Sequence, residues 1–446
     1  MTSNPLAIFP DTARISPAGS LVVGECDSGR LAEEFGTPLY LYDAATLDGA
    51  VDAYRRGLAQ SYPAATQLAY AAKAWLCTAT TRWATRRTLA LDVVSGGELA
   101  IAQRGGVEPG QIHFHGNNKS DAELAQALDT GVGRVVIDHQ EELRRLNALT
   151  LSRGMRQRIW LRVNPDVEAG AHRHIQTGHA ASKFGLSLHT GAAEATARDA
   201  LACQGIELAG LHCHIGSQIR DPAPLVDAAV RLVELAARLH AHSGWQPAEL
   251  SVGGGWAVPY TDEQRAGLPP IDYYVRQVAE AIVQSCQRHG LALPRLVLEP
   301  GRSLAARAGV ALYTVGAVKQ AGAVTYAFID GGLADNPRPA LYGASYSALL
   351  ANRRGDPARQ TVHIAGPYCE SGDVLISRHR AAPAASWRSA GCSGQRRLSV
   401  EHGQQLQRRA PAGRGLGGKW RGDAHPTPRD AGGSAASRSV SFRGRQ

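Results

Sequence analysis

An otherwise apolar run contains a lysine near its end: Leu68-Ala69-Tyr70-Ala71-Ala72-Lys73-Ala74. It is the first of a series of strand-like runs whose repetition predicts the fold. Seven more β-type runs follow it, separated by Ala-, Leu- and Glu-rich stretches suited to helices. Eight alternating strand and helix units predict a (β/α)8 barrel of the TIM type. The expected strands are 67–72, 89–94, 111–115, 134–138, 159–163, 208–214, 249–253 and 295–299.

Unusual polar residues and glycines gather at the carboxyl ends of these expected strands. In a (β/α)8 barrel these ends converge on one mouth, where the loops build the active site. The sequence therefore predicts a site composed of residues from several strands. These residues are Lys73, Asp92, His115, Asn164, His214, the glycines 253–255 and Glu299.

The chain on either side of the barrel has a different pattern. Residues 37–42 alternate like a strand, and β-type runs without intervening helices follow Arg302, at 310–318, 324–329 and 361–364. We therefore expect a C-terminal β domain that the N-terminus helps to complete. The predicted parts are an N-terminal segment (1–40), the barrel (41–303), the β domain (304–377) and a basic, aberrant or disordered tail (378–446).

Composition limits the classes of function. The chain has 446 residues, of which 44% are hydrophobic, and no apolar run is long enough to cross a membrane. Because the first thirty residues also lack the pattern of a signal peptide, we expect a cytoplasmic location. The seven cysteines are odd in number and lack metal-ligand spacing, so we expect reduced thiols and no metal site. The net charge of +9 lies in the tail, where 14 basic residues face 3 acidic ones, so the folded part gives no nucleic-acid signal.

Lys73 is the first candidate for covalent chemistry. A partly buried lysine has a lowered pKa, and its neutral amine can then form a Schiff base with an aldehyde. Taken alone, a lysine at the end of a strand more often extends its ammonium group into solvent. The other motifs decide between these interpretations.

The segment 210–218, Gly-Leu-His-Cys-His-Ile-Gly-Ser-Gln, places His212 and His214 on one face of a strand. An imidazole at the barrel mouth can lie against a pyridine ring, and the Ser217 hydroxyl can bind a phosphate. A metal pair and packed core histidines are the alternatives. The segment supplies no third ligand, which argues against a metal.

Two glycine-containing motifs follow the last expected strands. Gly253-Gly254-Gly255 allows backbone N–H groups to approach a phosphate, although such a run is also common in ordinary turns. Glu299-Pro300-Gly301-Arg302 combines a carboxylate, which can keep a pyridine nitrogen protonated, with a guanidinium that can bind a substrate carboxylate. A surface ion pair is the alternative for the second motif.

In this order and spacing, Ala-Tyr-Ala-Ala-Lys-Ala, His-Cys-His-Ile-Gly-Ser-Gln, Gly-Gly-Gly and Glu-Pro-Gly-Arg resemble the fold III pyridoxal-phosphate decarboxylases. Within that group, the segments 182–185 (Ser-Lys-Phe-Gly), 338–342 (Arg-Pro-Ala-Leu-Tyr) and 366–371 (Gly-Pro-Tyr-Cys-Glu-Ser) resemble the diaminopimelate decarboxylases. The resemblance covers roughly residues 15–376. It implies that pyridoxal 5'-phosphate is the cofactor and that meso-diaminopimelate is converted to L-lysine and CO2.

The resemblance also implies a role for each matching residue. Lys73 would be the Schiff-base lysine, His214 the imidazole stacked on the ring, and Glu299 the partner of the pyridine nitrogen. Further cofactor contacts would come from Ser217, Gly254, Gly255, Gly301 and Arg302. Substrate contacts would come from Arg302, Arg338, Tyr342 and Glu370.

Cys369 would be the proton donor, with Glu370 reading the distal ammonium of the substrate. In the family the matching pair reaches the mouth of the other subunit, which implies a homodimer with shared active sites. Related decarboxylases of ornithine, arginine or carboxynorspermidine are the enzymatic alternatives. A non-catalytic product, disabled by its altered C-terminus, is the alternative from another class.

The tail departs from the family pattern. No tyrosine follows Tyr368, and we expect no further strand after residue 379, so the family's C-terminal tyrosine has no counterpart. A basic nucleic-acid-binding arm is one interpretation. We favour a shifted reading frame that begins near Ser377, where family-like sequence stops abruptly. Translating the other frames of the encoding DNA should recover β-type strands and a tyrosine, and the hypothesis fails if neither frame does.

Overall fold

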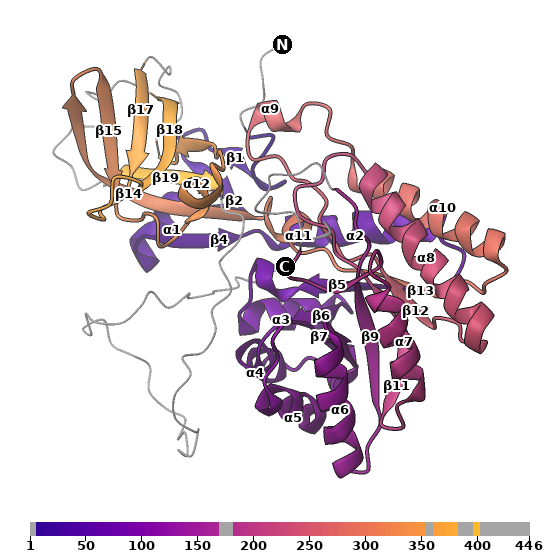
Figure 1. The fold of residues 1–446 in the computed structure, drawn as a ribbon. Helices are drawn as coiled ribbons and strands as arrows, with labels where there is room; N and C mark the ends of the chain where they lie inside the picture. Colours follow the sequence, from indigo (N-terminus) through magenta and orange to yellow (C-terminus); the bar gives the residue numbers. More distant parts are fainter. Residues whose placement is uncertain (1–5, 169–181, 353–359, 382–395, 402–446) are drawn as a thin grey trace.

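A closed eight-stranded parallel barrel forms the centre of the structure, a computed structural model that describes residues 6–168, 182–352, 360–381 and 396–401 (Figure 1). Each strand pairs with its neighbour, and the last pairs with the first to close the cylinder. All eight strands coincide with the expected runs, so the predicted barrel is confirmed. The strands are β5 (Thr66–Ala71), β6 (Ala90–Val93), β7 (Ile112–Phe114), β8 (Arg134–Ile137), β9 (Gln157–Asn164), β11 (Ile206–His212), β12 (Glu249–Ser251) and β13 (Arg295–Leu298).

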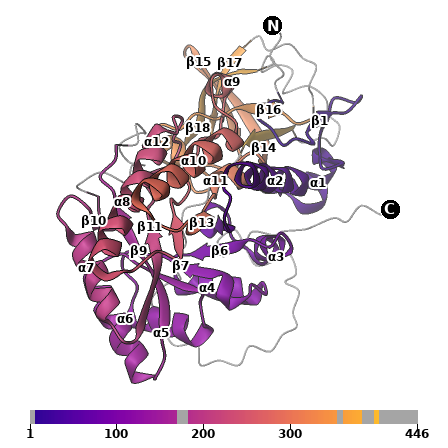
Figure 2. The ribbon, with the colours of Figure 1, turned by 90° about the vertical axis from the view of Figure 1, so that its right-hand side faces the viewer.

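Helices surround this barrel, as two perpendicular views show (Figures 1 and 2). Their starts follow local capping chemistry: Ser120 and Glu123 form a capping box, and Ser95 accepts a hydrogen bond from the Glu98 N–H. Only a short helix, α11, follows β13, and α2 packs on both β5 and α10. The helices are α2 (Ala44–Ser61), α3 (Thr78–Arg86), α4 (Gly96–Arg104), α5 (Asp121–Thr130), α6 (Gln140–Ser152), α7 (Ala192–Ala202), α8 (Ala223–Ser243), α9 (Asp262–Arg265), α10 (Ile271–His289) and α11 (Arg302–Ala305).

Short elements complete the barrel. The 3-10 turn η1 (Ala72–Ala74) follows β5, and η2 (Pro109–Gln111) precedes β7. The short strand β10 (Leu186–Ser187) pairs with the carboxyl end of β9, beyond the residues that pair with β8. Lys73 therefore lies in η1, one turn beyond the strand in which it was expected. The strand ends earlier because residues 72–74 curl into the barrel mouth.

The lumen of the barrel is filled by one large side chain among small ones. Trp160 is fully buried and packs with the strand alanines Ala69, Ala90 and Ala209. Its indole N–H donates to Glu249, 2.8 Å away, which also accepts from the Arg134 guanidinium. This buried group fills the barrel on the amino-terminal side of the strand ends, which leaves the mouth as the expected place for a ligand.

A separate sheet forms the β domain, so the predicted fold class, a barrel with an additional β domain, is confirmed. The order is β16-β19-β14-β15-β17-β18, and β4 from the N-terminal segment pairs with β14. A small sheet, β1-β2-β3, and α1 pack apolar side chains against β14. The elements are β1 (Arg14–Ile15), β2 (Leu21–Val23), β3 (Cys26–Asp27), α1 (Ser28–Phe35), β4 (Leu39–Tyr42), β14 (Gly309–Ala321), β15 (Val324–Ile329), α12 (Arg338–Tyr342), β16 (Ala348–Leu350), β17 (Gln360–Ala365), β18 (Val374–Ala381) and β19 (Arg396–Glu401).

The expectation of no strand after residue 379 is wrong. β18 extends to Ala381, and β19 pairs antiparallel with both β14 and β16. The alternating Leu398-Ser399-Val400 of β19 is too short to stand out within a basic stretch, and the long β14 offers an edge for it to pair with. The rest of the tail, including Cys392, lies outside the described residues.

Two other expectations concern thiols and membranes. The six cysteines in the described ranges are all free, which agrees with the reduced thiols expected from their spacing. Among the helices that the structure describes, none is both long enough and apolar enough to span a bilayer.

Candidate active site

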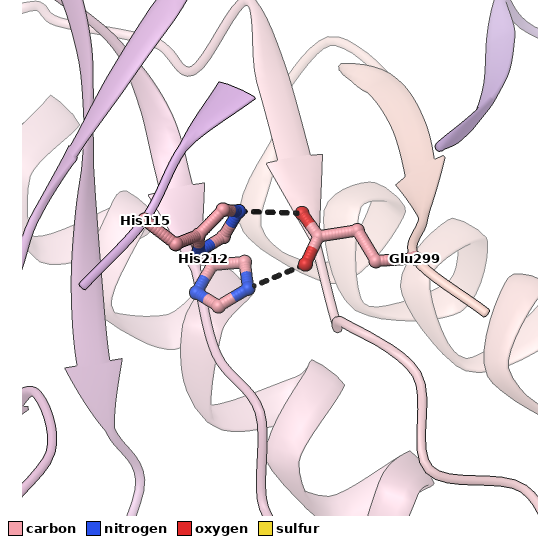
Figure 3. A group of neighbouring side chains, drawn as sticks. All are labelled: His115, His212 and Glu299. Carbon is pink, nitrogen blue, oxygen red and sulfur yellow. Dashed lines mark hydrogen bonds and ion pairs between the residues drawn. The ribbon is translucent and has the colours of Figure 1, made fainter. Parts of the chain in front are cut away.

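Glu299 is the centre of a buried polar cluster at the mouth of the barrel (Figure 3). It directly follows β13, and it meets His212, the last residue of β11, and His115, which follows β7. The His212 Nε2 atom lies 2.8 Å from one carboxylate oxygen, and the His115 Nε2 atom lies 3.8 Å from the other. The Ser251 hydroxyl donates to that second oxygen at 2.9 Å. Closure of the barrel thus brings together groups from four strands that are separated in the sequence.

Two neighbouring carboxyl groups in this cluster have opposite protonation states. Burial raises the pKa of Asp92 well above its usual range, and the nearby negative charge of Glu299 raises it further. Burial alone would also raise the pKa of Glu299, but His212 and His115 outweigh it and lower that pKa. At neutral pH, Glu299 is therefore the ionised member of the pair and Asp92 keeps its proton.

Substitution of Asp92 by asparagine is expected to stabilise the protein increasingly as pH rises from 5 to 8. A carboxyl group whose pKa is raised in the folded state lowers the free energy of unfolding as pH rises above its unfolded pKa. The loss is up to roughly 1.4 kcal/mol per pH unit and ends when the folded pKa is reached. Asparagine has no such titration. Urea denaturation at both pH values measures the difference, with Asp129→Asn on the exposed face of α5 as the control. A gain in the free energy of unfolding that is the same at both pH values would show that Asp92 is already ionised in the folded protein.

Lys73 lies in the same mouth, although no strand carries it. Solvent reaches its side chain, but protein atoms surround it, so the amine lies in a recess. Burial lowers the pKa of Lys73, the Arg162 guanidinium lowers it further, and the acidic side chains of Asp92 and Glu299 oppose this effect. The η1 turn contacts the loop after β13, because the Ala71 N–H donates to the Pro300 carbonyl at 3.1 Å. Lys73 and Glu299 thus belong to one site.

The loops after β11, β12 and β13 pack backbone against backbone. A Cβ atom on Gly254 would lie 2.3 Å from the Glu299 carbonyl, and one on Gly255 would lie 2.3 Å from the Gly216 carbonyl. Gly255 also has φ of +117°, which side chains disfavour. These glycines are therefore required for loop packing.

His214 and Ser217 hold this loop layer together. The Gly254 N–H donates to His214 Nδ1 at 3.4 Å, and burial, aided by the positive charge of Lys73, lowers the pKa of His214 well below its usual range. His214 is therefore neutral, and its ring is only half-buried. The Ser217 hydroxyl accepts from Arg302 Nε at 3.1 Å. Gly301, in the next loop, packs on Ala71 of β5.

Two buried arginines converge on a pair of tyrosines that the sequence analysis did not single out. Arg302 donates to the Tyr260 hydroxyl at 3.0 Å, and Arg338 donates to the Tyr346 hydroxyl at 2.7 Å. The two tyrosine rings lie 5.0 Å apart, and the Arg338 guanidinium also stacks on both. Arg338 forms no ion pair with an acidic residue in the described ranges, so a buried positive charge faces this corner.

The remaining predicted residues lie in the β domain. Tyr342 is half-buried at the end of α12, four residues after Arg338, so both lie on one face of the helix. Cys369 and Glu370 are exposed in the turn between β17 and β18, which Asp373 holds by accepting from the Tyr368 N–H at 2.9 Å. Neither bonds to a barrel residue that the structure describes.

Sequence reasoning missed the contacts between Glu299 and the histidines that surround it. His212 was noted only for its spacing from His214, and His115 and Asp92 only for their places at strand ends. The structure adds the third group that a metal site would need, because donor atoms of His115, His212 and Glu299 all lie within 4.8 Å of one another. His212 and Glu299 already satisfy each other with a short hydrogen bond, however, so a metal would have to break it.

Comparisons of sequence and of structure both find that this chain is similar to pyridoxal-dependent decarboxylases. The family model for the pyridoxal-dependent decarboxylase, pyridoxal binding domain, matches residues 49–306. Diaminopimelate decarboxylase of Bacillus subtilis is 42% identical over 366 residues, which cover 82% of this chain and 83% of the relative. The Synechocystis enzyme of the same name is 38% identical over 387 residues, which cover 85% and 81%.

Solved structures show the same likeness. Diaminopimelate decarboxylase from M. jannaschii, in complex with L-lysine, has a TM-score of 0.78 and 29% identity, covering 88% of this chain and 87% of that one. The Helicobacter pylori enzyme with L-lysine has a TM-score of 0.72 and 26% identity, covering 83% and 87%. A lysine/ornithine decarboxylase from Vibrio vulnificus, at 20% identity, shares the fold with a TM-score of 0.69.

Proposed function

Because this chain belongs to the diaminopimelate decarboxylase family of pyridoxal-dependent decarboxylases, we propose that it releases one carboxyl group of meso-diaminopimelate as CO2 and yields L-lysine. One observation carries the proposal. An amine of lowered pKa, a neutral imidazole and an ionised carboxylate meet at the mouth of one barrel, each from a different strand end.

The residues of the mouth fit pyridoxal phosphate. Lys73 offers an amine of lowered pKa to its aldehyde, the half-buried His214 offers the flat surface of its ring, and Glu299 offers an anionic acceptor for the ring nitrogen. Gly254, Gly255, Gly301, Ser217 and Arg302 lie on the loops after β11, β12 and β13, where the phosphate would bind. When bound, the cofactor supplies an electron-withdrawing ring that takes up the electron pair left as CO2 departs.

Arg338 supports a substrate with two carboxylates. A buried guanidinium without an acidic partner in the described ranges favours an anion, and a planar carboxylate can accept two of its N–H groups. Diaminopimelate retains a distal carboxylate that ornithine and arginine lack. We assign this carboxylate to Arg338 and Tyr342, and the carboxylate that leaves to the side of the mouth near Lys73.

Cys369 and Glu370 complete the proposed site from a second copy of the chain. Both side chains are exposed, as is Tyr368 beside them, and exposed groups in a fixed turn can reach a neighbouring subunit. In a homodimer, the Cys369 thiol would return a proton to the substrate carbon, and the Glu370 carboxylate would bind the distal ammonium. The active sites would then be shared between subunits.

Measuring CO2 release from several amino acids tests this proposed function. The purified full chain with added pyridoxal phosphate is expected to decarboxylate meso-diaminopimelate and to leave ornithine, arginine and carboxynorspermidine essentially unchanged. Turnover of one of these three instead would assign the chain to a related decarboxylase. A cofactor absorbance band without turnover of any substrate would show a non-catalytic product.

A further inference from the structure

We propose that His212 is a positioning residue that holds Glu299 as an ionised acceptor aimed at the ring nitrogen of the cofactor. The inference rests on the proposed function, since it concerns the same mouth. It adds a role for a residue to which the family resemblance gives none. Figure 3 shows the arrangement: the imidazole of His212 approaches the Glu299 carboxylate from the β11 side of the barrel.

The hydrogen bonds of Glu299 fix the plane of its carboxylate. One oxygen interacts with His212 Nε2 at 2.8 Å, and the other accepts from the Ser251 hydroxyl at 2.9 Å. A carboxylate has about four lone-pair positions, so two contacts still leave room for one more donor. A carboxylate held at both oxygens cannot rotate freely, and it therefore presents its remaining lone pairs in one direction.

The direction of the hydrogen bond follows from the chemistry of its two partners. The His212 side chain is buried, and its Nδ1 atom has no hydrogen-bond partner in the described residues. An ionised carboxylate can only accept, so the Nε2 atom of His212 carries the proton that it donates to Glu299.

The other titratable neighbours leave Glu299 as the negative charge of this cluster. Burial lowers the pKa of His115 well below its usual range, and burial lowers the pKa of His113 to about 4, so both rings are neutral at pH 7. Asp92 keeps its proton. A cofactor ring that carries a proton on its nitrogen would thus meet one anion, and His212 is the group that orients this anion.

Two cofactors that differ only at the ring nitrogen test the proposal without reference to activity. Pyridoxal phosphate and its 1-deaza analogue, in which carbon replaces the nitrogen, are titrated into the full chain in EDTA while absorbance is recorded. The wild type is expected to bind pyridoxal phosphate about tenfold more tightly or better, because only it donates to Glu299. His212→Leu is expected to bring the two affinities within about threefold, as Glu299→Gln does.

A matched variant separates positioning from packing. His212→Gln retains an N–H donor at the position of Nε2, and it is expected to keep most of the preference for pyridoxal phosphate. If His212→Leu does not fold, His212→Met replaces it, because its flexible side chain adapts to a core. Equal weakening of both cofactors in the Leu or Met variant would overturn the proposal, as would a wild-type protein that does not distinguish them.

The failure of the proposed function would look different. In that case the wild type would show no cofactor band, or Lys73→Ala would show the same band as the wild type. A normal, Lys73-dependent band with no preference between the two cofactors would refute only the role of His212.

Discussion

Replacement of Lys73 by alanine is expected to remove the visible absorbance band of the bound cofactor and to lower CO2 release more than about a thousandfold. The amine of Lys73 is the group that would bond to the aldehyde, and its lowered pKa makes the neutral, nucleophilic form easier to reach. Absorbance spectra of the purified variant and a CO2 assay measure the two effects separately.

Two further variants make this test specific. Lys73→Arg keeps the positive charge but not the nucleophilic amine, and it is expected to lose the band as the alanine variant does. Lys319→Ala removes an exposed lysine of β14 in the β domain and should leave both band and activity unchanged. Retention of the band in Lys73→Ala would place the covalent bond on another lysine.

Replacement of Cys369 by alanine is expected to lower decarboxylation about a hundredfold or more while leaving the cofactor band intact. The thiol is exposed and lies in the β domain, outside the group that would hold the cofactor. Loss of a proton donor slows turnover without affecting the Lys73 amine. Cys203→Ala, at the end of α7, serves as the control that should retain activity.

Mixing Cys369→Ala with Lys73→Ala tests whether the sites are shared. If subunits exchange at random in a dimer, half of the dimers carry both variants, and each of these has one intact site, so activity should recover to about a quarter of the wild-type value. Activity in the mixture that only equals the sum of the two variants would show that Cys369 serves its own chain. Size-exclusion chromatography of each variant confirms that both assemble alike.

The barrel could be predicted from local sequence because each strand is a short apolar run with a helix-compatible stretch on either side. All eight runs were placed within two residues of the strands found. The exceptions have local causes. Lys73 lies in a turn because residues 72–74 leave the strand, and β19 was missed because its apolar residues are few. β-pairing depends on the partner edge that β14 provides, which a local pattern does not contain.

The interactions within the mouth could be predicted only in part. Motif spacing identified Lys73, His214 and Glu299, since each stands at the end of a recognisable run. The contact between His212 and Glu299 joins residues 87 positions apart, and only closure of the barrel brings them together. The pairing of Arg302 with Tyr260 likewise joins residues 42 positions apart. Such contacts follow from topology and have no short-range signature.

The long strand β14 determines when the sheet of the β domain can form during synthesis of the chain. Leu312 pairs with Leu39, so the strand β4 cannot find its partner until more than half of the protein has left the ribosome. The barrel, which closes when β13 meets β5, needs only residues up to Leu298. Contacts between such distant positions are slow to form. The amino-terminal segment is the first part to emerge from the ribosome, yet its strand β4 can pair only after all the strands of the barrel have been synthesised.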